Sequence, residues 1–210
     1  MEHIDDFYAP SETLTSELKV KRSLFIARLS PCESAEDFRV ILSEVERLHK
    51  EANHSCWAYR LAPGADSQEI SHCSDDGEPT GTAGRPILSS IKRGELFCAA
   101  VIVTRYFGGI KLGVRGLIEA YGEASKTAVN LSRRALKIRT KRLSVNLPYA
   151  AIKDTTHALN SCGLVGNPIW SYEAEVRAEA EVRASFANHA ENALSELLNR
   201  KLIRSWEWVI

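Results

Sequence analysis

The stretch Thr104–Gly116, TRYFGGIKLGVRG, places glycines and cations where an apolar run gives way to a helical pattern. Backbone N–H groups in the first turn of a helix attract anions, and the helix dipole adds to this attraction. We therefore expect Arg105, Lys111 and Arg115 to contact phosphate groups. The glycines that shape this turn are Gly108, Gly109 and Gly113. The stretch matches neither the Walker nor the dinucleotide-binding pattern, and the alternative that its glycines only permit a tight turn stays open.

An acidic loop, SDDGEPTGTAGRP over 74–86, is the second candidate for chemistry. Its carboxylates, Asp75, Asp76 and Glu78, are of the type that supplies one or two ligands to Mg²⁺ beside a phosphate. They are also of the type that bonds turn amides or pairs with a cation such as Arg85. We favour the structural role and keep a magnesium-assisted phosphate site as the alternative.

Histidines and cysteines do not form a metal-binding pattern. On a strand His54 and Cys56 share a face, whereas the adjacent His72 and Cys73 point to opposite faces. These four side chains therefore do not converge easily on zinc, and we predict no metal and no cofactor. Cys56 or Cys73 as a nucleophile with His54 as its base stays an alternative to a buried, inert cysteine.

Charge is distributed unevenly along the 210 residues, although the net charge is zero. Residues 85–142 hold 13 Lys and Arg against three Glu, a net charge of +10, so the remainder carries −10. Six of the 13 cations lie in one run, formed by Arg133, Arg134, Lys137, Arg139, Lys141 and Arg142. Such a run attracts phosphates over a Debye length of ~8 Å. The alternative is a solvated strand or linker.

Hydrophobic periodicity predicts a mixed first part. The expected elements are a hairpin over 12–29, a capped helix from Ser34 to Lys50, strands over 55–61 and 69–73, a short helix near 87–91, a buried strand over 96–103 and a helix over 117–131.

The pattern restarts after the basic run, and residues 143–210 have βαββαβ order. This order is that of a split βαβ, ferredoxin-like domain. Its strand over 173–184 alternates small apolar residues with Glu and Arg. We predict that the polar face of this strand does not stack RNA bases, because it carries no aromatic residue. Trp206 and Trp208 are expected in the core or at a domain interface.

Several motifs together are similar to the core pattern of the IMPACT family, whose bacterial members are the YigZ-like proteins. They are SDDGEP and GTAGRP over 74–86, VIVTRYFGGIKLG over 101–113 and GLIEAY over 116–121, preceded by KRSLFIA from Lys21 and NHSCWAY from Asn53. The resemblance covers about residues 19–125. The sequence departs from the pattern at Val114-Arg115, where Thr-Gly would continue it.

The resemblance implies an α+β protein of two domains, an IMPACT-type domain over 1–138 and a ferredoxin-like domain over 139–210. The first is expected to be similar to the second domain of a small-subunit ribosomal protein, and the second to a domain of elongation factor G. Both analogues act on ribosomal RNA. Eukaryotic members act in translational control by occupying a partner of a starvation-sensing kinase. We do not transfer the kinase role, because those members carry an additional N-terminal module and this chain begins about 20 residues before the shared core.

We predict a translation-associated protein that binds RNA or the ribosome, regulates translation, and has no catalytic activity. A protein partner in the translation machinery is also compatible with the pattern. Two alternatives stay open: a magnesium-dependent enzyme acting on a phosphorylated small molecule or nucleotide, and a protein-interaction module. We expect a cytoplasmic location and no membrane contact, because no apolar run approaches the ~20 residues that span a bilayer and the first twenty residues lack a signal-peptide pattern.

Overall fold

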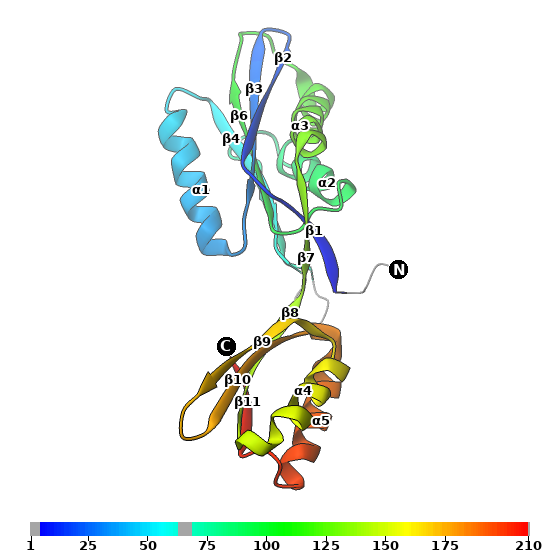
Figure 1. The fold of residues 1–210 in the computed structure, drawn as a ribbon. Coiled ribbons are helices and arrows are strands. Elements are labelled where there is room, and N and C mark those ends of the chain that lie inside the picture. Colours follow the sequence, from blue (N-terminus) through cyan, green and yellow to red (C-terminus); the bar gives the residue numbers. More distant parts are fainter. Residues whose placement is uncertain (1–4, 63–68, 210) are drawn as a thin grey trace. The chain divides into compact units, whose positions relative to one another are not determined.

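The computed structural model describes residues 5–62 and 69–209, and these form two compact units (Figure 1). The larger unit runs from Phe7 to Lys137. The smaller one contains residues 138–209 together with Asp5 and Asp6. None of the helices in the described part of the chain combines the length and apolar character that a bilayer span needs.

An antiparallel sheet of five strands forms the centre of the larger unit. Its strands are β2 (Leu14–Val20), β3 (Ser23–Pro31), β4 (His54–Arg60), β5 (Ser71–Ser74) and β6 (Ala99–Tyr106), in the order β2-β3-β6-β4-β5. The predicted hairpin is confirmed, with both turn residues Lys21 and Arg22 at positive φ. Strand β6 lies in the middle of the sheet and is buried on both faces, as its apolar run predicts.

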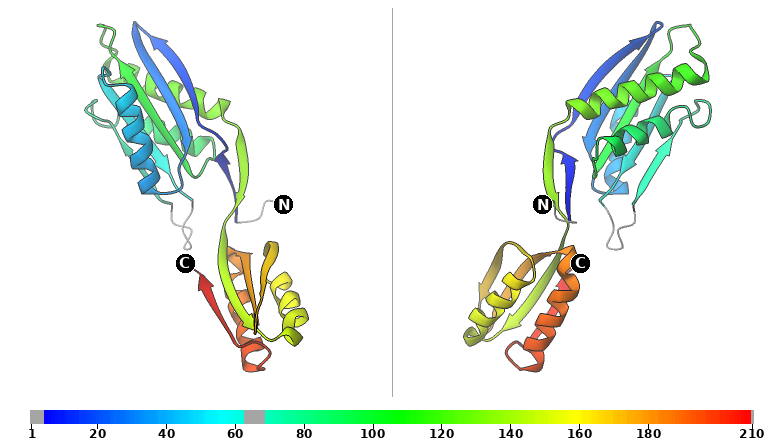
Figure 2. Two further views of the ribbon diagram at one scale, coloured as in Figure 1. Left: turned by 60° about the vertical axis from the view of Figure 1, so that its left-hand side comes forward. Right: turned by 90° about the vertical axis from the view of Figure 1, so that its right-hand side faces the viewer.

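Helices cover both faces of this sheet. Figures 1 and 2 show α1 (Ala35–Leu48) on one face, and α2 (Gly84–Arg93) and α3 (Gly113–Leu131) on the other. Helix α1 begins with the predicted capping box, in which Ser34 and Asp37 exchange side-chain and backbone hydrogen bonds of 3.0 and 3.1 Å. Phe38 and Val45 of α1 pack on Tyr59 and Ile102 of the sheet.

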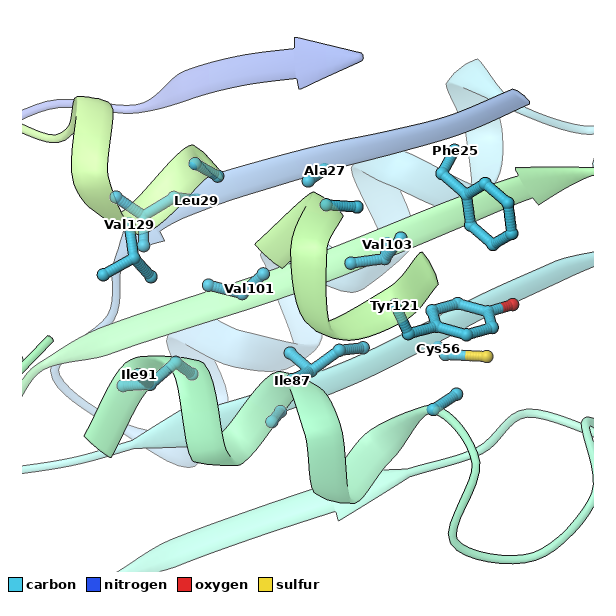
Figure 3. Close-up of a cluster of buried hydrophobic side chains, with 14 of the residues drawn as sticks. Phe25, Ala27, Leu29, Cys56, Ile87, Ile91, Val101, Val103, Tyr121 and Val129 are labelled. Carbon is cyan, nitrogen blue, oxygen red and sulfur yellow. The ribbon is translucent and has the colours of Figure 1, made fainter. Parts of the chain in front are cut away.

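The main core lies between the sheet and the pair α2 and α3 (Figure 3). Ile87 and Ile91 of α2 and Tyr121 of α3 are fully buried there. The Tyr121 ring meets Phe25 of β3 edge-on, with ring centroids 5.1 Å apart. These anchors fix which faces of α2 and α3 point outward.

Two boundaries differ from the expected ones. Strand β6 begins at Ala99 and not at 96, because Glu95 and Cys98 have positive φ and interrupt the extended chain. Helix α2 begins at Gly84, so the last three residues of the expected loop form its first turn. A Cβ atom at Gly84 would lie 2.9 Å from the Ser74 backbone, so this close approach requires glycine.

The basic run 133–142 forms strands and is not a flexible linker. Its first half is β7 (Arg134–Ile138), which pairs with β1 (Asp6–Pro10) in a two-stranded sheet. Its second half begins β8 (Thr140–Leu147).

The smaller unit has the predicted βαββαβ order. It comprises β8, the short 3₁₀ turn η1 (Tyr149–Ala151), α4 (Ile152–Ser161), β9 (Leu164–Tyr172), β10 (Val176–Arg183), the turn η2 (Ala184–Phe186), α5 (Ala187–Asn199) and β11 (Ser205–Val209). The strand order β11-β8-β10-β9 is that of a ferredoxin-like sheet, and α4 and α5 contribute to its core. Gly163 has a φ of 69°, as expected of a residue that ends a helix.

The alternation of buried apolar residues with charged residues that was expected over 173–184 is present from Val176 onward. Val176, Ala178 and Val182 are buried, whereas Arg177 is exposed and the other charged residues of β10 are partly exposed. Residues 173–175 form a turn, closed by a hydrogen bond from Glu173 N to Glu175 O, and Ala174 is therefore exposed and not part of the packed face.

Asp5 groups with the smaller unit because its partners are there. Its carboxylate accepts hydrogen bonds from Ser185 N at 3.0 Å and from Arg139 Nη2 at 3.0 Å. Burial raises the pKa of Asp5, but these hydrogen bonds outweigh burial and the net shift is downward. We retain a domain boundary near residue 138 as a proposal, with Asp5 and Asp6 assigned to the second domain.

Candidate nucleic-acid interface

Arg105, the first of the expected phosphate contacts, lies in the interior on β6 and is only 6% exposed. Its Nη1 donates to Glu78 Oε1 at 2.6 Å, and the Tyr121 hydroxyl donates to the same oxygen at 2.9 Å. Burial raises the pKa of Tyr121, so this hydroxyl stays a donor. The positive charge of Arg105 is therefore balanced by Glu78 inside the protein and is not presented to solvent.

His54 extends this network. Its Nδ1 lies 2.7 Å from the carbonyl oxygen of Asp76, and a carbonyl only accepts hydrogen bonds, so Nδ1 carries the proton. Its Nε2 lies 4.0 Å from Glu78 Oε1. The side chains of His54, Glu78 and Arg105 thus converge from β4, the acidic loop and β6.

The acidic loop holds its own shape with its carboxylates. Asp75 accepts hydrogen bonds from the backbone N–H groups of Gly81, Ala83 and Gly84 at 2.7–2.9 Å, and so caps the start of α2. Burial raises the pKa of Asp75, but these three bonds outweigh it and the net shift is downward. Asp76 accepts from Ser55 N at 2.6 Å. Among the described residues, no group of three or more His, Cys, Asp or Glu is arranged to hold a metal ion.

Cys56 has the surroundings of a structural cysteine. It is fully buried beside Tyr121 in the core (Figure 3), and its thiol donates to the carbonyl oxygen of Asp75 at 2.9 Å. Burial raises the pKa of Cys56 to about 12, so the reactive thiolate is not populated near neutral pH. This environment does not suit the nucleophile that the sequence left open. Cys73 on β5 is exposed, and His72 beside it is distant from His54 along the paired strands.

The glycine-rich turn between β6 and α3 separates into two parts. A Cβ atom at Gly108 would lie 2.0 Å from the Arg22 carbonyl oxygen, so Gly108 packs on the β2–β3 hairpin. Gly109 and Gly113 have φ values of 83° and 71° and face open space. Gly108 is therefore required for close packing against Arg22, and only the part of the turn from Gly109 to Gly113 has open space beside its glycines.

Two of the three cations expected at this turn, Arg105 and Lys111, line one pocket, and Arg115 does not. Arg105 is buried, and Arg115 pairs on the helix surface with Glu119 at 2.9 Å. Lys111 is exposed and lines a pocket of about 460 Å³ at the start of α3. Other lining residues include Asn53, His54, Glu78, Arg105 and Phe107.

A larger groove of about 870 Å³ lies between α2 and α3. Four cations line it: Arg85, Arg93, Lys126 and Arg134. Lys126 pairs with Glu123 at 3.4 Å, whereas the three arginines are exposed and form no ion pair with any described residue. Sequence reasoning counted Arg93 and Lys126 as charges but did not select them as contacts, because their proximity depends on how α2 packs on α3.

Hydroxyl groups and a glycine bring the two helices of this groove close together. The Ser125 hydroxyl donates to Ser90 Oγ at 2.9 Å, and Ser90 Oγ lies 3.2 Å from the Gly122 carbonyl oxygen. A Cβ atom at Gly94 would lie 2.3 Å from Val129 Cγ1. This close packing determines the position of the cations that line the groove.

Most other cations of the run 133–142 have acidic partners. These pairs are Arg133 with Glu12 at 3.5 Å, Lys137 with Glu33, Arg139 with Asp5 at 3.0 Å and Arg142 with Glu181 at 3.1 Å. Lys141 lies 5.2 Å from the ring centroid of Trp208. Arg134 is the member of the run that faces the α2–α3 groove.

Comparison with known proteins assigns a family to this fold. Residues 21–129 match the family described as the Impact N-terminal domain. An IMPACT family member of Haemophilus influenzae is 34% identical over 148 residues, which are 70% of this chain and 71% of that protein. The Bacillus subtilis IMPACT family member YvyE is 29% identical over 202 residues, 94% of this chain and 89% of that protein. A solved structure described as a hypothetical protein is 25% identical with a TM-score of 0.67, covering 99% of this chain and 98% of the other.

Proposed function

The chain belongs to the IMPACT family, and we propose that it is a cytoplasmic, translation-associated protein that binds RNA or the ribosome through the α2–α3 groove and regulates translation without catalysis. The family resemblance supports the link to translation, since its eukaryotic members act in translational control. The contact surface is proposed from this chain's own residues.

One observation carries the proposal. Arg85, Arg93 and Arg134 line one groove, are exposed, and form no ion pair with any described residue. Cations that already have an acidic partner contribute little to binding a new anion, whereas unpaired arginines offer their full donor set to phosphate oxygens. The groove therefore suits a phosphate backbone better than the run 133–142, most of which is paired.

The expected effect of salt on the affinity for nucleic acid can be calculated from the number of phosphates that are neutralised. A protein that neutralises about three phosphates with its arginines loses roughly fortyfold in affinity for duplex DNA between 50 and 200 mM salt, on a slope of about −0.9 per phosphate. Each cation removed lowers that slope by about 1.

The experiment is co-sedimentation of the full chain with ribosomes and with separated subunits across a salt series. The test variant is Arg93→Ala/Arg134→Ala, and the control is Lys153→Ala, which removes an exposed charge from α4 in the other unit. We expect wild-type binding that weakens with salt, a shallower salt slope for the double variant, and no change for the control. Absence of binding at 50 mM salt, or equal binding by the double variant, would contradict the proposal.

A further inference from the structure

We propose that the 460 Å³ pocket at the start of α3 binds a nucleoside monophosphate, with the phosphate at Lys111 and the helix N-terminus and the base on the apolar wall. This pocket shares no lining residue with the α2–α3 groove. The inference therefore goes beyond the proposed function and can fail or succeed independently of it.

The anion end of the pocket is formed by backbone and by one lysine. Helix α3 is 19 residues long, and Leu112 is its N-cap residue. The Leu112 side chain accepts no hydrogen bond from the N–H groups of the first turn. Its first turn also lacks an acidic residue. The free N–H groups carry about half a positive charge, and Lys111, which forms no ion pair with a described residue, adds a full one. Both features favour a phosphate group.

Arg105 provides an independent indication of a ligand. Its side chain is 7% exposed and lines the same pocket, yet its Nε has no hydrogen-bond partner. A buried donor without a partner is destabilising, and such groups in native proteins call for an explanation. The remaining charges of the pocket, Arg105 and Lys111 against Glu78, leave it net positive.

The other side of the pocket suits a flat, largely apolar group. Phe107 is 44% exposed and Val114 is 60% exposed, and both line the cavity beside Leu117. The Arg105 guanidinium lies 5.3 Å from the Phe107 ring centroid and holds the ring in place. A nucleobase can stack favourably on such a ring.

His54 completes the match to a nucleotide. Nδ1 is bonded to the Asp76 carbonyl, so Nε2 is the ring nitrogen left for a ligand, and His54 also lines the cavity. A ribose hydroxyl can both donate and accept a hydrogen bond, and so can pair with this nitrogen. The volume lies within the ~300–1,000 Å³ range of small-molecule sites.

The test is isothermal titration of the full chain with AMP, adenosine and inorganic phosphate, without added metal. We expect AMP to bind at least about tenfold more tightly than either fragment, because it engages both ends of the pocket. Lys111→Ala should weaken AMP binding about tenfold or more, as expected for loss of a charge-assisted hydrogen bond. Phe107→Ala should weaken AMP and adenosine but not phosphate. Lys153→Ala, which removes an exposed charge from α4 in the other unit, is the control and should leave AMP binding unchanged.

Three results would overturn the proposal: no AMP binding at millimolar concentration, equal affinity for AMP and phosphate, or AMP binding that Lys111→Ala weakens no more than Lys153→Ala does. Lys111 is exposed, so its replacement leaves the core intact, and a thermal unfolding curve of each variant checks this. Competition by a 5′-phosphorylated RNA decamer, but not by its 5′-hydroxyl form, would identify an RNA end as the nucleotide's source. Binding of AMP without such competition would identify a free nucleotide.

Discussion

Replacing Glu78 with glutamine is expected to destabilise the larger unit by about 3–5 kcal/mol. Glu78 and Arg105 are 4% and 7% exposed in their side chains and lie 2.6 Å apart. The substitution keeps the size of the side chain and an oxygen that accepts from Tyr121, but leaves the guanidinium buried without a counter-charge. A loss of this size corresponds to a fall in melting temperature of roughly 10–15 °C for a unit of this size.

The surface pair of Glu123 with Lys126 provides the control. Its two side chains are 56% and 58% exposed, and such pairs contribute about 0–1 kcal/mol. Glu123→Gln should therefore leave the unfolding free energy nearly unchanged. The contrast between the two glutamine variants isolates the effect of burial.

Hydrogen exchange followed by mass spectrometry is the suitable assay, because it reports on the two units separately. Amides of β3 and β6 that exchange through global opening should lose roughly 150- to 5,000-fold of their protection in Glu78→Gln. Those of the smaller unit should not change. The double variant Glu78→Gln/Arg105→Met should regain part of the loss, since no unpaired charge remains. A cost below 1 kcal/mol for Glu78→Gln, or a double variant as unstable as the sum of the single ones, would refute the reasoning.

Three further predictions follow from single contacts. The folded-state pKa of Asp75 lies below the ordinary value of 3.8, so its stabilising effect is present above that value and is lost as pH falls through the folded pKa. Asp75→Asn should therefore lower the urea midpoint at pH 7, and its difference from the wild type should shrink below about pH 4; a constant difference would contradict this. Gly108→Ala should destabilise by several kcal/mol through its clash with Arg22, whereas Gly109→Ala in open space should cost only about 1–2 kcal/mol; equal urea midpoints would exclude the clash. Ultraviolet crosslinking to RNA should label peptides of α2 and α3 and not residues 176–183; preferential labelling of β10 would overturn the expected lack of base stacking there.

Local patterns were sufficient for most elements of this fold. The period of two in β10, the 3.6-residue period and capping box of α1, and the glycine that ends α4 each arise from interactions between near neighbours. Element boundaries were less accurate at Ala99 and Val176, because residues with positive φ precede Ala99 and a turn hydrogen bond precedes Val176, so both strands begin later than expected.

Which charges are available to a partner depended on contacts between residues far apart in the chain. Arg105 follows an apolar run, and its sequence neighbourhood resembles that of a surface anion site, yet Glu78, 27 residues earlier, neutralises it inside the core. Lys137 and Arg142 are paired by acids 104 and 39 residues away. Conversely, Arg93 and Arg134 line one groove only because α2 packs on α3. Motifs, composition and local order were enough to predict the family, the α+β class and the segregation of charge. They could not predict which cations are buried, paired or free, because a charge interacts strongly with whatever lies within a few ångströms of it, and that distance is set by folding.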